Sequence, residues 1–312
     1  MSEQLQNHLQ INAQSLEVNY GSFQALNIEH LAVRGRIIAL VGHNGSGKST
    51  LIKTLLQLLM PRHGYIVSSL TADAPGKMLL PHEDMAFSPE EGAIFEDLTV
   101  ASYFQLWCRL KRGSGNYYKN QGLPLLEKFQ VQNLLHKYGR QLSKGQRRRV
   151  QMVVGFLSNP RFFLFDEPFD GLDVEQTSRL VQILSQEAKQ TALLISSHRM
   201  EIVERLADAL IVLKQGKVSA AGTLETVCQN LCPCGFAINL EHNSQSGEAL
   251  TASLREYFSP LLISPSAARI TLYGKDIARE KLVQILQAQG QSEEQIIAIK
   301  PSLIEAMHYH LL

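Results

Sequence analysis

The stretch from Gly42 to Thr50 has the residue types and the spacing that bind phosphate. A glycine, four further residues and then Gly-Lys-Ser form the phosphate-loop pattern. In such a loop the glycines let backbone N–H groups face the phosphates, the lysine neutralises the β- and γ-phosphates, and the following hydroxyl binds Mg²⁺. The sequence therefore predicts a nucleoside triphosphate site formed by Gly42, His43, Asn44, Gly45, Ser46, Gly47, Lys48, Ser49 and Thr50.

The segments on both sides of this loop have the periodicity that such a site needs. Residues 37–41 are continuously apolar, as in a strand buried on both faces, and leucines and isoleucines recur at helical spacing from Leu51 until Pro61. The N-terminus of that helix would place a partial positive charge opposite the anion. Because strand, loop and helix follow in this order, we favour a phosphate site over a glycine-rich turn without function.

Two further apolar runs end in residues that could do chemistry. Phe162–Phe165 is followed by Asp166 and Glu167, and Ala192–Ile195 is followed by a Ser-Ser pair and His198. Carboxylates at the end of a buried strand are unfavourable unless they meet a cation or take part in a reaction. In an open parallel α/β sheet, ligands bind beyond the carboxyl ends of the strands. We therefore expect these side chains to lie beside the phosphate loop.

Composition excludes some classes of protein. The 312 residues are 45% hydrophobic and 19% charged, which is usual for a globular chain long enough for two domains. The net charge of +1 provides no overall field that would recruit nucleic acid or a membrane surface. The polar, Gln-rich start has no secretory signal, and no apolar run is long enough to span a bilayer. We expect a cytoplasmic protein.

The rest of the chain divides into segments of different character. Residues 16–31 alternate as in antiparallel strands, a helical insert is expected over about 96–155, and Leu123–Tyr138 has the pattern of one helix within it. We expect a linker over 226–235, followed by a small α+β domain over 236–312 with a regulatory or docking role. Tyr20 could stack on a purine ring or be ordinary half-buried packing.

The cysteines do not form a familiar metal-binding pattern. Cys108 is isolated, and Cys228, Cys232 and Cys234 follow the spacing C-x3-C-x-C without a second pair nearby. We interpret them as reduced, structural thiols rather than a metal or redox site.

Taken in order, these motifs identify a family. The phosphate loop, Leu142-Ser143-Lys144-Gly145-Gln146, Asp166-Glu167-Pro168, Gly171-Leu172-Asp173 and His198 make the chain resemble the ATP-binding subunit of an ABC transporter over about residues 11–225. The resemblance implies a P-loop NTPase of ABC type, with an antiparallel β subdomain and a helical insert. It also implies ATP and Mg²⁺ as ligands and ATP hydrolysis as the activity.

The resemblance assigns a role to each matching residue. Tyr20 would stack on adenine, Asp166 would hold Mg²⁺ through water, Glu167 would be the general base, and His198 would contact the γ-phosphate. Ser143, Gly145 and Gln146 of the signature would complete the site of an opposite subunit, and Asp173 would link the two ATP sites. The implied partners are a second ATP-binding subunit, in a homo- or heterodimer, and an integral membrane permease. The chain would then lie on the cytoplasmic face of the membrane.

Two positions depart from the common family pattern. Lys144 replaces the usual glycine of the signature, and Glu90 stands where a glutamine usually senses Mg²⁺ and the membrane partner. Glutamate still offers an oxygen ligand but adds a charge and cannot donate a hydrogen bond. Pro89-Glu90, Lys144 and the tail 301–306 resemble the ABC-2 exporter branch, so we expect export.

The motifs leave two alternative functions to compare with this one. A soluble ABC ATPase acting on ribosomes or nucleic acid usually has two such domains in one chain or a long coiled-coil insertion, neither of which is seen. An ATP-dependent sensor with the C-terminal domain as its output is a third hypothesis. Arg147-Arg148-Arg149 lacks interleaved aromatic residues, which favours a solvated or structural face over nucleic-acid binding.

Overall fold

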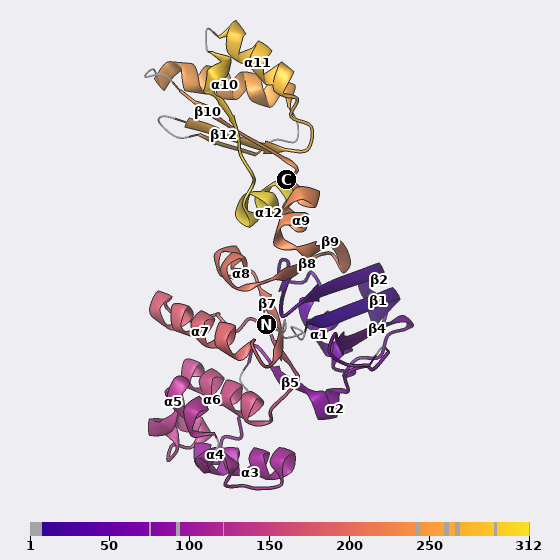
Figure 1. The fold of residues 1–312 in the computed structure, drawn as a ribbon, viewed down its shortest axis with the longest axis vertical. Helices are drawn as coiled ribbons and strands as arrows, with labels where there is room; N and C mark the ends of the chain where they lie inside the picture. Colours follow the sequence, from indigo (N-terminus) through magenta and orange to yellow (C-terminus); the bar gives the residue numbers. More distant parts are fainter. Residues whose placement is uncertain are drawn as a thin grey trace, which may run out of the picture. The chain divides into compact units, whose positions relative to one another are not determined.

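The computed structural model describes residues 8–74, 76–91, 94–120, 122–240, 244–258, 262–265, 269–289 and 292–311. The chain forms two compact units, residues 1–222 and residues 223–312 (Figure 1). Within the described residues, every helix is too short or too polar to cross a bilayer.

A six-stranded sheet forms the centre of the first unit, in the order β5-β6-β7-β3-β8-β9. The pairs β5/β6, β6/β7, β7/β3 and β3/β8 are parallel. The strands are β3 (Ile37–Val41), β5 (Met85–Ser88), β6 (Phe162–Phe165), β7 (Ala192–Ser197), β8 (Ala209–Lys214) and β9 (Lys217–Thr223). All residues of β3, β6 and β7 are buried. The continuous apolar runs predict this burial except for the two serines at the end of β7.

The two faces of this sheet are covered by different layers (Figure 1). An antiparallel sheet in the order β2-β1-β4 and helix α1 pack on one face, where Phe162 and Leu164 point. Helices of the insert, α7 and α8 pack on the other face, where Phe163 and Phe165 point. Alternate residues of β6 thus belong to two separate cores. The antiparallel layer and α1 are β1 (Leu9–Tyr20), β2 (Phe23–Gly35), β4 (His63–Leu70) and α1 (Lys48–Leu55).

The helices of the other layer differ in length. They are α3 (Val100–Arg112), α4 (Tyr117–Asn120), α5 (Leu123–Lys128), α6 (Lys144–Leu157), α7 (Val174–Glu187) and α8 (Met200–Leu206), with 3₁₀ turns at Gln132–Leu134 and Gly139–Gln141; the short α2 (Pro81–Asp84) directly precedes β5. The single helix expected over Leu123–Tyr138 is wrong. Helix α5 ends at Lys128 because Gln130 adopts a positive φ of 52°, which a right-handed helix does not allow.

The second unit has a βαββαβ core, in which an antiparallel sheet has the order β11-β12-β10-β13. This is the split βαβ, or ferredoxin-like, arrangement. Its elements are α9 (Leu224–Leu231), β10 (Cys234–Asn239), α10 (Ser244–Tyr257), β11 (Leu262–Pro265), β12 (Arg269–Gly274), α11 (Arg279–Ala288), a 3₁₀ turn (Glu293–Gln295), β13 (Ile296–Ala298) and α12 (Leu303–Leu311). All four cysteines of the chain are free thiols, and only Cys234 is not buried.

The linker expected over 226–235 is wrong. Thr223 caps a helix there by accepting a hydrogen bond from the Thr226 N–H, and α9 buries Val227, Cys228 and Leu231 on one face. The second unit therefore begins at residue 223 rather than at 236.

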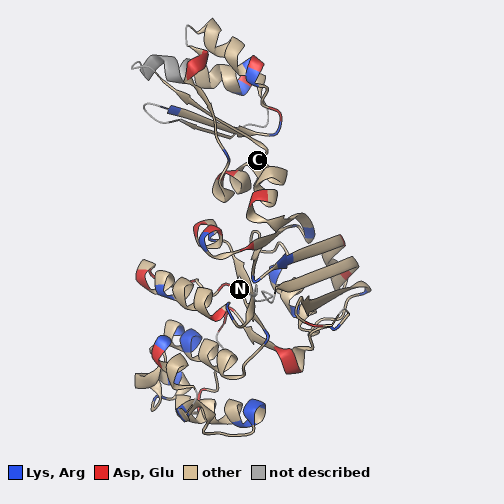
Figure 2. Ribbon diagram, viewed as in Figure 1, with Lys and Arg blue, Asp and Glu red and all other residues tan. Residues whose placement is uncertain are grey.

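Charged side chains of both signs are interspersed along the elements of both units (Figure 2). Along the described elements, neither sign forms a long continuous run, so the local charges discussed below act mainly over short distances.

Candidate active site

The phosphate loop connects the end of β3 to the start of α1. Helix α1 begins at Lys48, and the preceding Gly47 has a φ of 107°. A side chain at Gly47 would also meet Leu26 Cδ2 at 2.6 Å, so only glycine fits this position. The buried Ser46 Oγ has no hydrogen-bond partner among the described residues. An unpartnered hydroxyl and a helix N-terminus in one loop are suited to an anionic ligand.

Lys48 is held inside this loop. Its Nζ donates to the carbonyl oxygens of Gly42, at 2.7 Å, and His43, at 3.3 Å, and lies 3.4 Å from Glu167 Oε1. The side chain is only 7% exposed. A buried ammonium group with one nearby carboxylate can bind a further negatively charged group favourably.

A hydroxyl on β7 organises the two acids that follow β6. Ser196 Oγ donates to Asp166 Oδ1 at 2.6 Å and accepts from the Glu167 N–H at 2.8 Å. Asp166, Glu167 and Ser196 are all buried. The backbone of Glu167 has a positive φ of 47°, a strained conformation that persists at functional sites when the surroundings enforce it.

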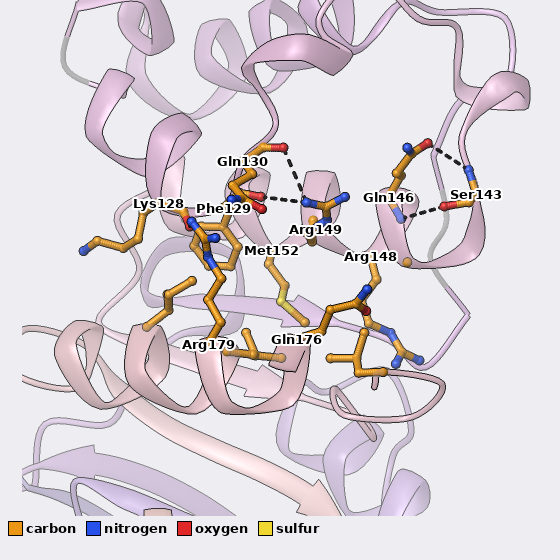
Figure 3. A pocket seen from close by; sticks show the side chains of 14 residues that line it. Lys128, Phe129, Gln130, Ser143, Gln146, Arg148, Arg149, Met152, Gln176 and Arg179 are labelled. Carbon is orange, nitrogen blue, oxygen red and sulfur yellow. Dashed lines mark hydrogen bonds between the residues drawn. The ribbon is translucent and has the colours of Figure 1, made fainter. Parts of the chain in front are cut away.

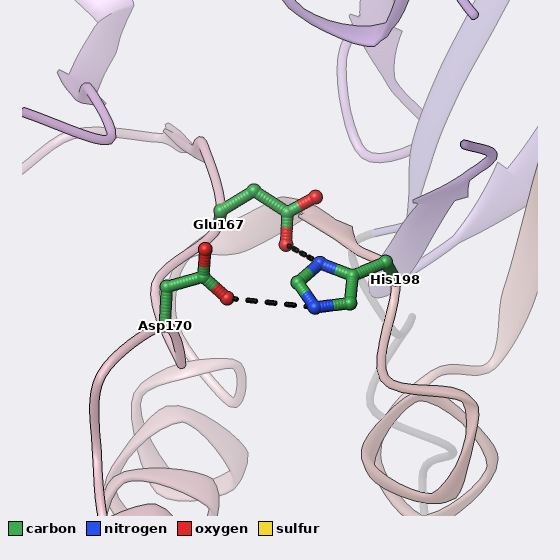
Figure 4. Close-up of side chains that lie close together, drawn as sticks. All are labelled: Glu167, Asp170 and His198. Atoms are coloured by element: carbon green, nitrogen blue, oxygen red, sulfur yellow. Dashed lines mark hydrogen bonds and ion pairs between the residues drawn. The ribbon is translucent and has the colours of Figure 1, made fainter. Parts of the chain in front are cut away.

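His198 completes this cluster from the end of β7 (Figure 4). Its Nδ1 lies 3.1 Å from Glu167 Oε2, and its Nε2 lies 3.8 Å from Asp170 Oδ1. The imidazole is half exposed. The Glu167 carboxylate therefore has Lys48 beside one oxygen and His198 beside the other. Glu167, Asp170 and His198 could also place three metal-ligand atoms within 4.8 Å of one another.

One cavity of about 380 Å³ joins the phosphate loop to the acids. Its lining includes the sequence-predicted residues Tyr20, His43, Asn44, Gly45, Gly47, Lys48, Ser49, Thr50, Glu90, Asp166 and Glu167. The oxygen-bearing residues predicted to bind Mg²⁺, Ser49, Glu90 and Asp166, thus share this cavity, and oxygen donors are the ligands that Mg²⁺ prefers.

The sequence interpretation missed three residues of this neighbourhood. Phe23 pairs with Tyr20 across the β1–β2 turn and lines the cavity beside it. The two-residue turn at Gly21-Ser22 was the available signal for that pair. Ser196 and Asp170 also contact the cluster, but a serine and an aspartate near a strand end have no distinctive spacing.

The signature residues line a different cavity, of about 410 Å³, between the insert and α7 (Figure 3). Ser143, Gly145 and Gln146 lie at one side of it. Ser143 caps α6 through a capping box, in which its Oγ accepts from the Gln146 N–H at 3.3 Å and its own N–H donates to Gln146 Oε1 at 3.1 Å. Asp173 caps α7 by accepting from the Gln176 N–H.

Comparison with known proteins shows the family to which the chain belongs. The sequence profile described as "ABC transporter" matches residues 26–170, and a profile described as "AAA domain, putative AbiEii toxin, Type IV TA system" matches residues 138–204. The ABC-type transporter ATP-binding protein EcsA of Bacillus subtilis is 30% identical over 202 residues, which cover 64% of this chain and 80% of EcsA. This chain belongs to the ABC transporter ATP-binding family.

Further similarities agree with that assignment. The sulfate/thiosulfate import ATP-binding protein CysA of Mesostigma viride is 32% identical over 213 residues, which cover 67% of this chain and 60% of CysA. The solved structure of an ATP-binding subunit of an ABC transporter superposes with a TM-score of 0.62 and 29% identity, over 70% of this chain and 92% of that chain. The chain is therefore an ABC-type ATPase subunit with an α/β P-loop fold.

Proposed function

We propose that this ABC ATPase subunit pairs with a second ATP-binding subunit and uses ATP hydrolysis to drive a separately encoded integral membrane permease. One observation carries the proposal. Within a single chain, the phosphate loop and the acids line one cavity, whereas Ser143, Gly145 and Gln146 line another. A second subunit would bring its signature to the first cavity, and this chain would offer its own signature in return.

The cavity of the phosphate loop has the groups that ATP needs. Lys48 and the N-terminus of α1 would bind the β- and γ-phosphates, and Tyr20 with Phe23 would stack against the adenine. Tyr20 is 45% exposed and Phe23 is 66% exposed, so both residues have free surface that a base could contact. Ser49, Glu90 and Asp166 would hold Mg²⁺, which neutralises charge on the phosphates when it is bound.

The position of Glu167 suits a general base. Lys48 Nζ would move from Glu167 Oε1 to the incoming γ-phosphate, because the phosphate carries more negative charge than the carboxylate. His198 would move from Glu167 Oε2 to donate a hydrogen bond to the same phosphate. Glu167 would then be free to accept a proton from a water molecule while the oxygen of that water attacks the γ-phosphorus. The bond from phosphorus to the bridging oxygen breaks, and ADP and inorganic phosphate leave.

Export is the finer part of the proposal. It is supported by the resemblance of Glu90, Lys144 and the C-terminal unit to the ABC-2 exporter branch. The names of the relatives do not indicate export. CysA is named for import, and the name of EcsA gives no direction of transport. Pull-down of the tagged chain from detergent-solubilised membranes of its source should capture a multi-helix permease with ATP turnover. Recovery of ribosomes or nucleic acid instead would contradict the permease partner.

The variant Glu167→Gln tests the catalytic core of the proposal. We expect it to bind ATP, to lose on the order of 10²-fold or more of its hydrolysis, and to form an ATP-dependent dimer in light scattering. Glu256→Gln, an exposed residue of the second unit, is the matched control and should behave as the wild type. Unchanged turnover would show that another residue is the base, and an ATP-bound monomer would contradict the paired-site arrangement.

A further inference from the structure

We infer that Arg148 is a positioning residue that ties the signature helix to the two segments that bear Glu90 and Glu167. The side chain leaves α6, the helix that begins at the signature, and is only 3% exposed. Its Nη2 donates to the Glu90 carbonyl oxygen at 3.1 Å. Its Nη1 donates to the carbonyl oxygens of Pro168, at 3.3 Å, and Asp170. One guanidinium group thus joins three chain segments of the candidate site.

The neighbouring arginines bind elsewhere. Arg147 donates to Leu142 O and pairs with the exposed side chain of Glu96. Arg149 Nη1 lies within hydrogen-bond distance of the carbonyl oxygens of Phe129 and Gln130, at 3.4 and 3.5 Å (Figure 3). Of these three consecutive arginines, only Arg148 has described hydrogen bonds both to the backbone of Glu90 and to the turn that follows Glu167.

The burial and charge around Arg148 favour its hydrogen bonds to the three carbonyl oxygens. The guanidinium has its described hydrogen bonds to backbone carbonyls, and burial lowers its pKa while the charges of Asp170, Glu90 and Glu167 oppose that shift. A buried cation is stable only where its donors are satisfied. The planar guanidinium presents five donors in a fixed fork, so it fixes the direction as well as the distance of its partners.

This geometry links the signature to catalysis, and the inference rests on the proposed function. Ser143 caps the start of α6, so contact of the signature with the second subunit's ATP would act directly on the helix that bears Arg148. Through Arg148, a shift of α6 would reach the backbone of Glu90 and the turn that follows Glu167. Asp170 in that turn faces His198. Arg148 would thus set the positions of the groups around the γ-phosphate without touching the nucleotide.

The test compares Arg148→Gln, Arg148→Lys and the matched control Arg149→Gln in the full chain. Steady-state ATP hydrolysis gives kcat and KM, a fluorescent ATP analogue gives nucleotide affinity, and thermal unfolding gives the folded fraction at the assay temperature. For Arg148→Gln we expect kcat to fall on the order of 100-fold, with KM and nucleotide affinity close to the wild type. Lysine should restore part of kcat, because it retains donors but lacks the planar fork. Arg149→Gln should keep the wild-type kcat.

The outcomes separate this inference from the proposed function. If the wild type does not hydrolyse ATP, the proposed function fails. If the wild type hydrolyses ATP and folded Arg148→Gln has the same kcat, or if Arg149→Gln loses as much activity, the positioning role of Arg148 is wrong. A loss of nucleotide affinity in parallel with kcat would indicate a merely structural role and would also overturn it. If the glutamine variant does not fold, the lysine variant decides by the same criteria.

Discussion

At the scale of single residues, Glu167 shows how packing holds the proposed general base in an unfavourable backbone conformation. Its backbone has a positive φ, which for a non-glycine residue is strained by about 1–3 kcal/mol. The Ser196 hydroxyl accepts a hydrogen bond from the Glu167 N–H and donates one to Asp166, and these two bonds hold the turn in place. Lys48 and His198 then hold the carboxylate on both sides. The strain is therefore offset by neighbours that the proposed mechanism uses.

Asp73 gives a prediction about pH at the same scale. The hydrogen bond and charge of Arg161 lower the pKa of Asp73, and the Arg161 guanidinium also pairs with Asp84. A lowered pKa in the folded state stabilises the protein above the unfolded value, about 3.9, and this contribution is lost as pH falls through the folded value. Asp73→Asn should therefore lower Tm at pH 7. The difference in Tm between this variant and the wild type should shrink below about pH 4.

The control for Asp73 is an exposed ion pair. Asp97 pairs with Arg140 at the surface, where its side chain is 89% exposed, and such pairs contribute little to stability. Asp97→Asn should leave Tm nearly unchanged when unfolding is followed by circular dichroism at pH 7, 5 and 3.5. A Tm difference for Asp73→Asn that stays constant across this range would show that ionisation of Asp73 is not the cause.

The residues that were predicted from sequence are those whose spacing is fixed by the ligand. Lys48 and Glu167 belong to motifs that one nucleotide imposes on a short stretch of chain. Ser196 and Arg148 act through partners 30 and 20 positions away, so only the fold reveals them. A buried arginine with carbonyl partners is also indistinguishable in sequence from its solvated neighbours. The roles assigned to the motif residues stay predictions until activity is measured.

At the scale of elements, the contact between α6 and β6 is unusually close. A methyl group at Gly155 of α6 would lie 2.1 Å from Phe163 Cζ. Phe163 cannot easily move, because its ring stacks on Phe165 at 4.0 Å between centroids and meets Phe156 edge-on at 4.8 Å. The absence of a side chain at Gly155 therefore sets how near the signature helix can approach the central sheet.

Replacing Gly155 should reverse the usual effect of alanine in a helix. Alanine favours a helix over glycine by up to about 1 kcal/mol, but Gly155→Ala should lower the free energy of unfolding by about 1–3 kcal/mol because the core is overpacked. Gly145→Ala is the control in the same helix, since its methyl group would meet nothing within 4 Å and should not destabilise the protein. Urea denaturation measures the free energy of unfolding of both variants. Equal stability of the two variants would contradict the role given to Phe163.

Elements with a continuous apolar run were predictable, and those defined by the conformation of one residue were not. The runs that became β3, β6 and β7 are apolar throughout, so their burial followed from composition. The break after α5 depends on the left-handed conformation of Gln130, a residue type that does not require it. Helix α9 lies where the sequence pattern predicts a linker, because its cysteines and polar residues obscure an apolar face at helical spacing.

At the scale of the whole chain, each unit has a hydrophobic core of its own. In the first unit, two clusters lie on opposite faces of the parallel sheet. The second unit has a cluster formed by its sheet and the helices α10 and α11, which includes Ile238, Leu254, Leu272, Leu282 and Ile285. Because a separate core permits separate unfolding, the two units need not respond to ATP together.

Calorimetry should therefore resolve two unfolding transitions. ATP should raise the midpoint temperature of the first unit's transition only. The Glu167→Gln variant is suited to this experiment because its ATP should persist during the scan. At a free ATP concentration 100 times Kd, ligand binding should stabilise the first unit by about 2.7 kcal/mol, while the transition of the second unit stays in place. Lys48→Ala should abolish the shift, because Lys48 stands at the centre of the phosphate loop. A single transition that moves as a whole would instead show that the two units unfold cooperatively, and the C-terminal unit would then share the stabilisation by ATP.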